Sequence, residues 1–544
     1  MRPLSEFIEE LKRLDIRIWA KGDRLAYDAP SGVVTKGVLE EMKLRKAELL
    51  GFLGDVMVMA APTLRSVELP DRIPLSFSQE HLCVLDQIEG GGVAYNMSCA
   101  LEIHPIFELN RNVLEEVLRE ILQRHHGLRS CFPEDGNGWR QLIKPLDTFE
   151  FPYVDLRETN EERREAELES LYSEQSSIEF DLQNGPLYRF ILIRMDDGRY
   201  VLINTIHHTV MDGLSWNIFI REVIELYDSF ILKKPCPWPE MAIQYTHFSV
   251  WQRQCLDGER LRRLLAYWGK ELHGVGNLEL PLDFPRKASM TFVGATVEKI
   301  LPADLDLETY CKEQSITLYS FLFAAYHVLL ASISGNSDVV VGTSSANRNR
   351  VELEGLMGYF INTLAIRSKP LDWMAFDEFL SIFTNSTADA FSHQDLPFEK
   401  LLAELKPERQ ANRTPIFQVF FAIESDEMAN PEEEEQRIHY LYLAPSKMSS
   451  GTAHFDLSMS IHRNHDNEIG VSLNYNSDLF KEKKILGWLD DFVLFLQRIV
   501  QDSNITIGEL RELYRESEAD RKMKLLNSGG IAKVGMPRPR VRGR

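Results

Sequence analysis

The spacing of hydrophobic residues divides the chain into a short front unit and a long remainder. Apolar residues recur every three or four positions across residues 4–14, which predicts an amphipathic helix. Residues 16–20 and 24–27 alternate around a Lys-Gly-Asp turn, which predicts a hairpin, and residues 36–53 carry two further helical segments. A unit of about fifty residues is near the lower limit for folding alone, so we expect it to bind a partner or a second copy.

The remainder of the chain predicts a large α/β assembly of two lobes. Strands and helices alternate there without a repeat at solenoid spacing. The segment before it follows neither period and contains Pro62, Pro70 and Pro74, which discourage a continuing helix. The polar composition after the last lobe predicts a disordered tail. The predicted divisions are a small front unit 1–54, a linker 55–72, an N-terminal lobe 73–250, a C-terminal lobe 251–512 and the tail 513–544.

A strand-to-helix connection in the first lobe carries an unusual group of polar residues. Two dense apolar runs, 187–195 and 200–206, flank an Asp-Asp-Gly turn signal and predict a hairpin. The sequence His-His-Thr-Val-Met-Asp-Gly at 207–213 follows at once, and helical spacing resumes after it. Loops held by rigid elements often carry chemistry.

The residue types in this connection suit proton handling. A neutral imidazole such as that of His208 accepts or donates a proton near neutral pH, as attack by an amine or hydroxyl on a carbonyl demands. Asp212, four residues on, could orient the ring, brace the loop through an arginine, or cap the helix. Spacing alone leaves these three roles open, and a pair of turn histidines with a capping aspartate is the alternative without function.

Composition narrows the function classes. The formal net charge of −21 disfavours binding to nucleic acid. The six cysteines form no CxxC pair and have no histidine at metal-ligand spacing, so we expect reduced thiols and no metal. The N-terminus lacks an apolar signal core, and polar residues interrupt the longest apolar stretch, 318–333. We therefore expect a cytoplasmic protein without membrane contact.

The 207–213 motif resembles the HHxxxDG signature of condensation, epimerisation and heterocyclisation domains of non-ribosomal peptide synthetases, which are related to the chloramphenicol acetyltransferase family. Other stretches resemble the ordered motifs of the same family, and they lie at 75–80, 124–132, 245–251, 341–348, 358–364, 393–398 and 413–419. The resemblance covers nearly the whole chain after residue 70. It implies two acetyltransferase-like lobes in a V-shaped pseudo-dimer with a central tunnel.

The resemblance also implies a reaction. An upstream carrier protein would present an acyl or peptidyl group as a phosphopantetheine thioester, and an acceptor amine, free or on a downstream carrier, would attack its carbonyl. No cofactor would be bound to this chain itself. His208 would handle the proton or position the amine, and Asp212 would pair with Arg348 from the other lobe. Gly213 would let the backbone approach the carbonyl and stabilise an oxyanion, or would simply allow a tight turn.

Two groups of residues have supporting roles by the same resemblance. His207 and Arg129 are expected to support the site, and His125 and His126 to brace the N-terminal lobe. Residues 1–54 resemble the docking domains that precede such synthetase domains.

In that docking family the hairpin captures an acidic C-terminal peptide of the upstream protein, and the domain often dimerises. Arg17, Lys21 and Arg24 would supply cationic contacts and Trp19 an apolar one, with an ordinary solvated face as the alternative.

Three rival functions stay open at this point. An epimerisation domain would use His208 for proton exchange at an α-carbon, although residues 344–364 resemble condensation domains. An ester-forming O-acyltransferase is the second rival. A degenerate recruitment module is the third, against which the intact His208, Asp212 and Gly213 argue. The sequence shows no adenylation motif and no phosphopantetheine attachment site, so both a free-standing enzyme and a fragment of a larger synthetase fit.

Overall fold

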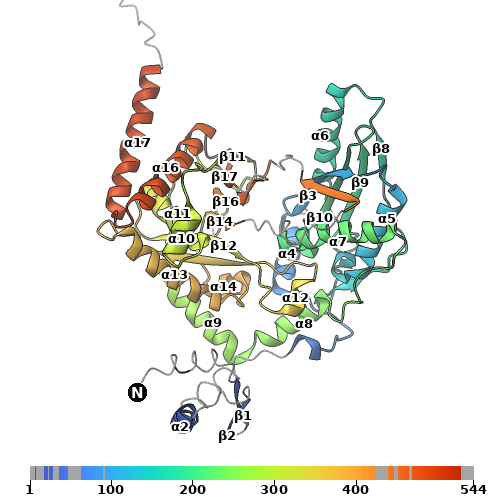
Figure 1. Cartoon of the computed structure of the whole chain (residues 1–544), viewed down its shortest axis with the longest axis horizontal. Helices are drawn as coiled ribbons and strands as arrows, with labels where there is room; N and C mark the ends of the chain where they lie inside the picture. Colours follow the sequence, from blue (N-terminus) through green and yellow to red (C-terminus); the bar gives the residue numbers. More distant parts are fainter. Residues whose placement is uncertain are drawn as a thin grey trace, which may run out of the picture.

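The computed structural model describes residues 7, 17–21, 24–28, 36–46, 63–89, 92–407, 410–423, 439–445, 451–464 and 468–528. Two sheets, each covered by helices, form the two arms of a V (Figure 1). Helices α8 (Tyr245–Cys255) and α9 (Gly258–Glu271) lie at the base where the arms meet (Figure 1). The mixed α/β class and the two-lobed arrangement are as predicted.

The N-terminal lobe contains a five-stranded sheet in the order β15-β3-β10-β9-β8. These strands are β3 (Asn96–Pro105), β8 (Tyr153–Asp155), β9 (Tyr188–Arg194), β10 (Tyr200–His207) and β15 (Leu441–Pro445). Strands β9 and β10 pair antiparallel, which confirms the predicted hairpin. Strand β15 comes from the sequence assigned to the other lobe and pairs antiparallel with β3, an exchange that the hydrophobic pattern did not predict.

Both faces of this sheet are buried, which explains why β10 is apolar at nearly every position. Val201 and Ile203 pack with the core beneath α6 (Glu161–Ser177), while Leu202 and Ile206 pack with the opposite core. That second core includes α5 (Arg111–Arg124) and α7 (Gly213–Ile231). The two-residue period of the strand places successive side chains on opposite faces, so its end presents successive histidines in opposite directions.

The C-terminal lobe contains a six-stranded sheet in the order β11-β17-β16-β14-β12-β13. Its strands are β11 (Gly294–Ile300), β12 (Val339–Ser345), β13 (Asn362–Ser368), β14 (Val419–Ile423), β16 (Leu457–Arg463) and β17 (Ile469–Asn476). It packs against helices α10 (Leu307–Glu313), α11 (Leu318–Ser334), α13 (Phe376–Ser392) and α16 (Glu482–Gln501).

Helix α11 is apolar on every side because it crosses the interior of this lobe, where almost all of its side chains are buried. Among the described residues no single helix is long and apolar enough to cross a membrane. Only α10 and α11 together reach that length and composition, as a pair bent by 102°.

The two sheets share a common core of four strands. In the first lobe β10 pairs antiparallel with β3 and β9, and β9 pairs parallel with β8. In the second lobe β17 pairs antiparallel with β11 and β16, and β16 pairs parallel with β14. Helix α7 follows β10 just as α16 follows β17. The repeated topology is that of a pseudo-dimer.

The predicted disordered tail is wrong for residues 513–528. They continue α17 (Ile507–Ser528), which extends along the outer side of the C-terminal lobe (Figure 1). Tyr514 is buried, and Arg521 pairs with the buried carboxylate of Asp491 at 2.6 Å. A few strong contacts therefore hold a helix whose sequence is polar nearly all round. Residues 529–544 lie outside the described part.

The front unit contains the predicted hairpin. Strands β1 (Arg17–Lys21) and β2 (Arg24–Asp28) pair antiparallel, with Trp19 opposite Ala26, and α2 (Lys36–Leu44) follows. Apart from Phe7, the predicted helix at 4–14 lies outside the described residues. The side chains of the four residues expected to bind a docking peptide, Arg17, Trp19, Lys21 and Arg24, also lie outside them.

Candidate active site

The structure places the two histidines and the aspartate where the sequence predicted, between β10 and α7. Strand β10 ends at His207, a 3-10 turn η3 (His208–Val210) follows, and α7 begins at Gly213. The His208 amide donates to the carbonyl of Tyr95, just before β3, at 2.9 Å. The connection is therefore fixed to a neighbouring strand as well as to its own.

Asp212 fills two of the roles that the spacing left open. As the N-cap of α7, its Oδ1 accepts from the Ser215 amide at 2.8 Å. The same oxygen accepts from Arg348 Nη2 at 2.8 Å, and the Phe360 amide donates to Oδ2 at 3.0 Å. The side chains of Asp212 and Arg348 are only 3% and 5% exposed. The predicted ion pair is thus present, and it joins the two lobes through a fully desolvated contact.

The hydrogen bonds of His208 define its tautomer. Its Nδ1 lies 2.8 Å from the carbonyl oxygen of Met211. Because a carbonyl only accepts, Nδ1 must carry the proton, which leaves the lone pair of Nε2 free in the neutral ring. Burial lowers the pKa of His208, and this effect outweighs the opposite influence of the Met211 carbonyl and Asp212. At neutral pH the ring is therefore a neutral acceptor with a fixed orientation.

His207 faces the interior of its own lobe. Its side chain is buried, and Nδ1 accepts from the Thr209 amide at 3.3 Å and lies 2.9 Å from the Thr209 hydroxyl. The ring meets Phe180 edge-on. Burial lowers the pKa of His207 to about 3, so it stays uncharged. These contacts suit the structural role that was predicted for it.

The predicted bracing residues make the contacts of structural side chains. The Arg129 guanidinium donates to the carbonyls of Leu122 and Lys144. His125 Nε2 lies 2.8 Å from Glu222, a buried carboxylate on α7 that the sequence did not single out. His125 Nδ1 accepts from the Met357 amide of the other lobe at 3.4 Å, so this buried network also contacts the inter-lobe junction.

Gly213 is the first residue of α7, and its two predicted roles, close approach to a carbonyl and a tight turn, stay predictions. Its φ is not in the left-handed region, and a Cβ built there would meet no atom within 4 Å. The space beside the start of α7 is open. The glycine therefore leaves room next to the backbone, as the predicted close approach of a carbonyl would need.

Aromatic and polar side chains from both lobes surround His208, and sequence reasoning missed them. The Tyr359 ring meets the His208 ring at a centroid distance of 4.8 Å. His454, from the second lobe, stacks with Tyr95 at 6.0 Å. Surrounding protein lowers the pKa of His454 to about 4, although its side chain remains exposed to solvent. Single residues at loop positions give no periodic signal that could have revealed them.

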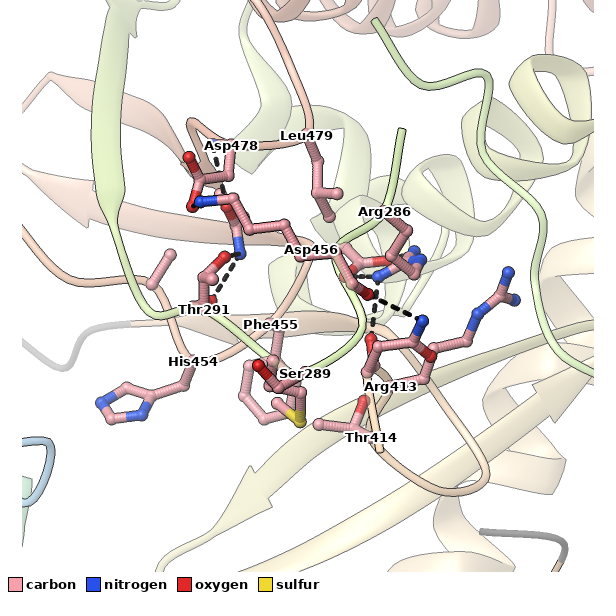
Figure 2. A pocket seen from close by; sticks show the side chains of 15 residues that line it. Arg286, Ser289, Thr291, Arg413, Thr414, His454, Phe455, Asp456, Asp478 and Leu479 are labelled. Carbon is pink, nitrogen blue, oxygen red and sulfur yellow. Dashed lines mark hydrogen bonds and ion pairs between the residues drawn. The ribbon is translucent and has the colours of Figure 1, made fainter. Parts of the chain in front are cut away.

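A pocket opens in the second lobe beside His454, at the connection from β17 to α16. Figure 2 shows its lining, with the His454 ring directed away from the paired side chains of Arg286 and Asp456. Lys287 and Asp478 form a second pair at 2.7 Å. Because these charges already have partners, the pocket offers little charge for an ionic ligand.

Comparison with known proteins assigns the family. The condensation domain model matches residues 70–521, and the TubC N-terminal docking domain model matches residues 4–55. The chain therefore belongs to the condensation domain family, a family of acyltransferases of non-ribosomal peptide synthetases, and carries a docking domain at its front. The predicted family and fold are confirmed.

Curated relatives support the same family, and a solved structure supports the same fold. The chain is 34% identical over 467 residues to chondramide synthase cmdD from Chondromyces crocatus, covering 85% of this chain and 12% of that protein. It is 33% identical over 466 residues to malpinin synthetase from Mortierella alpina, covering 82% and 6%. The X-domain from teicoplanin biosynthesis has the same fold, with a TM-score of 0.72 at 24% identity over 82% of this chain and 99% of that one. The chain spans only a small part of the two synthetases.

Proposed function

We propose that this chain forms an amide bond between an acyl or peptidyl thioester on an upstream carrier protein and an acceptor amine. The observation that carries the proposal is the ring of His208, which its Nδ1 bond holds with the Nε2 lone pair available and whose loop is fastened across the lobes by Asp212 and Arg348. Membership of the condensation domain family supports the same reaction.

The proposed reaction needs alignment more than strong base catalysis. A thioester is already activated and a neutral amine is a good nucleophile, so holding both in place supplies much of the rate. As the C–N bond forms and the C–S bond breaks, Nε2 of His208 takes the proton from nitrogen and passes it to the leaving sulfur. The Gly213 amide, at the first position of α7 where backbone donors lack helical partners, would stabilise the oxyanion.

Both substrates would arrive on flexible arms through the predicted central tunnel. His208 is half-buried and His454 is exposed, yet surrounding protein lowers the pKa of both. Solvent-accessible surface on His208, beside side chains from both lobes, is expected of a residue that lines such a passage.

The partners would follow from this arrangement. The arms would be phosphopantetheine groups of an upstream and a downstream carrier protein, or a free amine on the acceptor side. The front hairpin would bind an acidic C-terminal peptide of the upstream protein, and the docking domain could also pair two copies of the chain. The setting would be the cytoplasm, where carrier proteins are loaded.

A single-turnover assay tests the proposal. The full chain is mixed with a carrier protein bearing N-acetylphenylalanine as thioester, together with glycyl carrier or glycine amide, and products are identified by mass spectrometry. Amide formed by the wild type and strongly slowed in His208→Ala supports the proposal.

The same assay separates the rivals. Ester formed only with an added alcohol would instead indicate an O-acyltransferase, and deuterium exchange at the donor α-carbon without transfer would indicate an epimerisation domain. No reaction with any acceptor, despite tight binding of the carrier, would indicate a recruitment module.

A further inference from the structure

We infer that Glu399 and Tyr359 form a binding site for the ammonium form of the acceptor amine, and that Glu399 takes the proton that the amine must lose before it attacks. This inference rests on the proposed function and adds the residue that prepares the nucleophile. It assigns ammonium recognition to the C-terminal lobe, opposite His208.

The position of Glu399 is fixed by hydrogen bonds around Asn362. Glu399 lies in the first turn of α14 (Phe398–Leu405). The Phe398 amide donates to Asn362 Oδ1 at 3.1 Å, and Asn362 Nδ2 donates to the Leu396 carbonyl at 2.8 Å. Asn362 opens β13, three residues after Tyr359. The start of α14 is therefore fastened to the segment that carries Tyr359.

One oxygen of the half-buried Glu399 carboxylate, Oε2, lies away from solvent and has no hydrogen-bond partner among the described residues. The carboxylate also accepts a hydrogen bond from the backbone of its own residue. Burial raises the pKa of Glu399 to about 7. The neighbouring Lys400 does not neutralise it, because its ammonium lies over the Phe77 ring at 4.5 Å. A carboxylate oxygen that is buried without a partner is costly to ionise, and a cation that arrives with the substrate would lower the cost.

Two charged side chains on the helices packed against α14 are already in pairs. Helix α4 (Phe77–Glu89) contributes Glu80, which pairs with Arg253 at 2.5 Å. Helix α9 contributes Arg260, which pairs with Asp395. Tyr359, next to β13, is the titratable group whose pKa responds to Glu399. These elements therefore supply no described cation that pairs with the Glu399 carboxylate.

Tyr359 connects Glu399 to the reaction centre. Burial is the main cause of the raised pKa of Tyr359, and Glu399 exerts the largest effect of any single side chain on it, ahead of Asp212. The Tyr359 ring also contacts the His208 ring. A carboxylate and an aromatic ring each attract an ammonium group. Tyr359 therefore contacts His208 directly and is coupled to Glu399 through charge.

The proton transfer balances without any further reactant. The ammonium R–NH₃⁺ gives one proton to the Glu399 carboxylate and becomes R–NH₂, whose lone pair attacks the thioester carbonyl. The second proton leaves nitrogen through His208 to the departing sulfur, and Glu399 returns its proton to solvent after product release. An α-amino group has an ordinary pKa of about 7.7–8.0, so transfer to a carboxylate with a pKa of about 7 costs little.

The first test measures the site directly. Infrared difference spectra of the full chain are recorded against pH for the wild type, Glu399→Gln and the matched control Glu404→Gln, which alters an exposed carboxylate on the same helix. We expect a carboxyl group titrating near pH 7 in the wild type and the control, absent from Glu399→Gln. Benzylammonium chloride should move that titration to lower pH. A titration that saturating benzylammonium leaves unchanged would overturn the inference.

The second test uses two amines with the N-acetylphenylalanyl carrier as donor. Benzylamine is protonated at pH 7 and trifluoroethylamine is neutral. Glu399→Gln should slow transfer to benzylamine about 10- to 100-fold at pH 7, with recovery as rising pH deprotonates the amine, and should slow transfer to trifluoroethylamine less than threefold. Equal loss with both amines would mean a merely structural role.

The outcomes separate the two proposals. If the wild type transfers to neither amine while benzylammonium still shifts the carboxyl titration, the ammonium site stands and amide formation fails. If the wild type forms both amides and Glu399→Gln equals Glu404→Gln at every pH, the ammonium site fails and amide formation stands.

Discussion

The two lobes contain the same strand-to-helix connection, and the two copies make different contacts. Between β10 and α7 the connection presents His208, and its Asp212 is held by Arg348 from the opposite lobe. Between β17 and α16 the corresponding residues make contacts within their own lobe. There Asn476 donates to the Thr291 carbonyl, and the Lys481 amide donates to Asp283.

The two connections differ in which part of the molecule they contact. In the first lobe its partners come from the other arm of the V, so the loop lies where two bodies join. In the second lobe Leu479 and Phe480 turn into the local core, and ion pairs fill the pocket beside them (Figure 2). A shared topology therefore creates two candidate sites, and the inter-lobe contact selects one of them.

The largest expected effect comes from removing that contact. Arg348→Ala leaves the Asp212 carboxylate buried without its cation, so the free energy of unfolding should fall by about 3–5 kcal/mol. Chemical denaturation measures it, and Arg348→Ala/Asp212→Asn should recover part of the loss. Equal stability of Arg348→Ala and wild type would show that the lobes are joined elsewhere.

The next prediction contrasts the two connections in activity. His208→Ala should reduce amide formation about 100-fold, because the proton relay is lost while alignment persists. Asp478→Asn, at the corresponding place in the second lobe, should stay within threefold of the wild type. Single-turnover rates with the N-acetylphenylalanyl carrier provide the measurement, and a comparable loss in Asp478→Asn would end the distinction between the two connections.

A smaller effect concerns stability against pH. The folded state holds the Glu399 proton up to about pH 7, whereas the unfolded chain loses it near its ordinary pKa of 4.5, so the stability contributed by this group is lost as pH rises through 7. Glu399→Gln should therefore be more stable than the wild type by about 3 kcal/mol at pH 8 and equal to it at pH 4. Thermal unfolding curves of the variant and the wild type at pH 4 and pH 8 test this difference in stability, with Glu404→Gln as the control.

The smallest expected effect is a flat pH profile. Because burial lowers the pKa of His208 from its ordinary value of 6.5, the neutral ring remains the major form as pH falls from 8 to 6.5. With trifluoroethylamine, which needs no deprotonation, the rate should change less than twofold over this interval. A fall centred near pH 7 would show that the ring ionises in the working range.

Sequence reasoning found what local pattern and motif carry. The hairpin before His207, the start of α7 and the pairing of Asp212 with Arg348 were all predicted. Glu399 was not, because an acidic residue in the first turn of an amphipathic helix is an ordinary feature of helices. Its partial burial and its effect on the pKa of Tyr359 are revealed only by the folded chain.

The sequence also did not predict the long-range pairing of β15 or the extent of the weakly patterned helix α17. Strand β15 is short, and nothing in its sequence says that its neighbour is β3. In α17 the polar residues conceal the buried side chain of Tyr514 and the pair between Arg521 and Asp491.

The exchange of β15 also constrains how the protein is made. During vectorial synthesis the first sheet is nearly complete when residue 207 leaves the ribosome, but the outer edge of β3 stays uncovered until Pro445 has emerged. The unpaired backbone groups of an uncovered edge can form hydrogen bonds with strands of other chains. A chain cut between the lobes would retain that edge permanently, so the two halves should aggregate rather than fold when they are expressed apart.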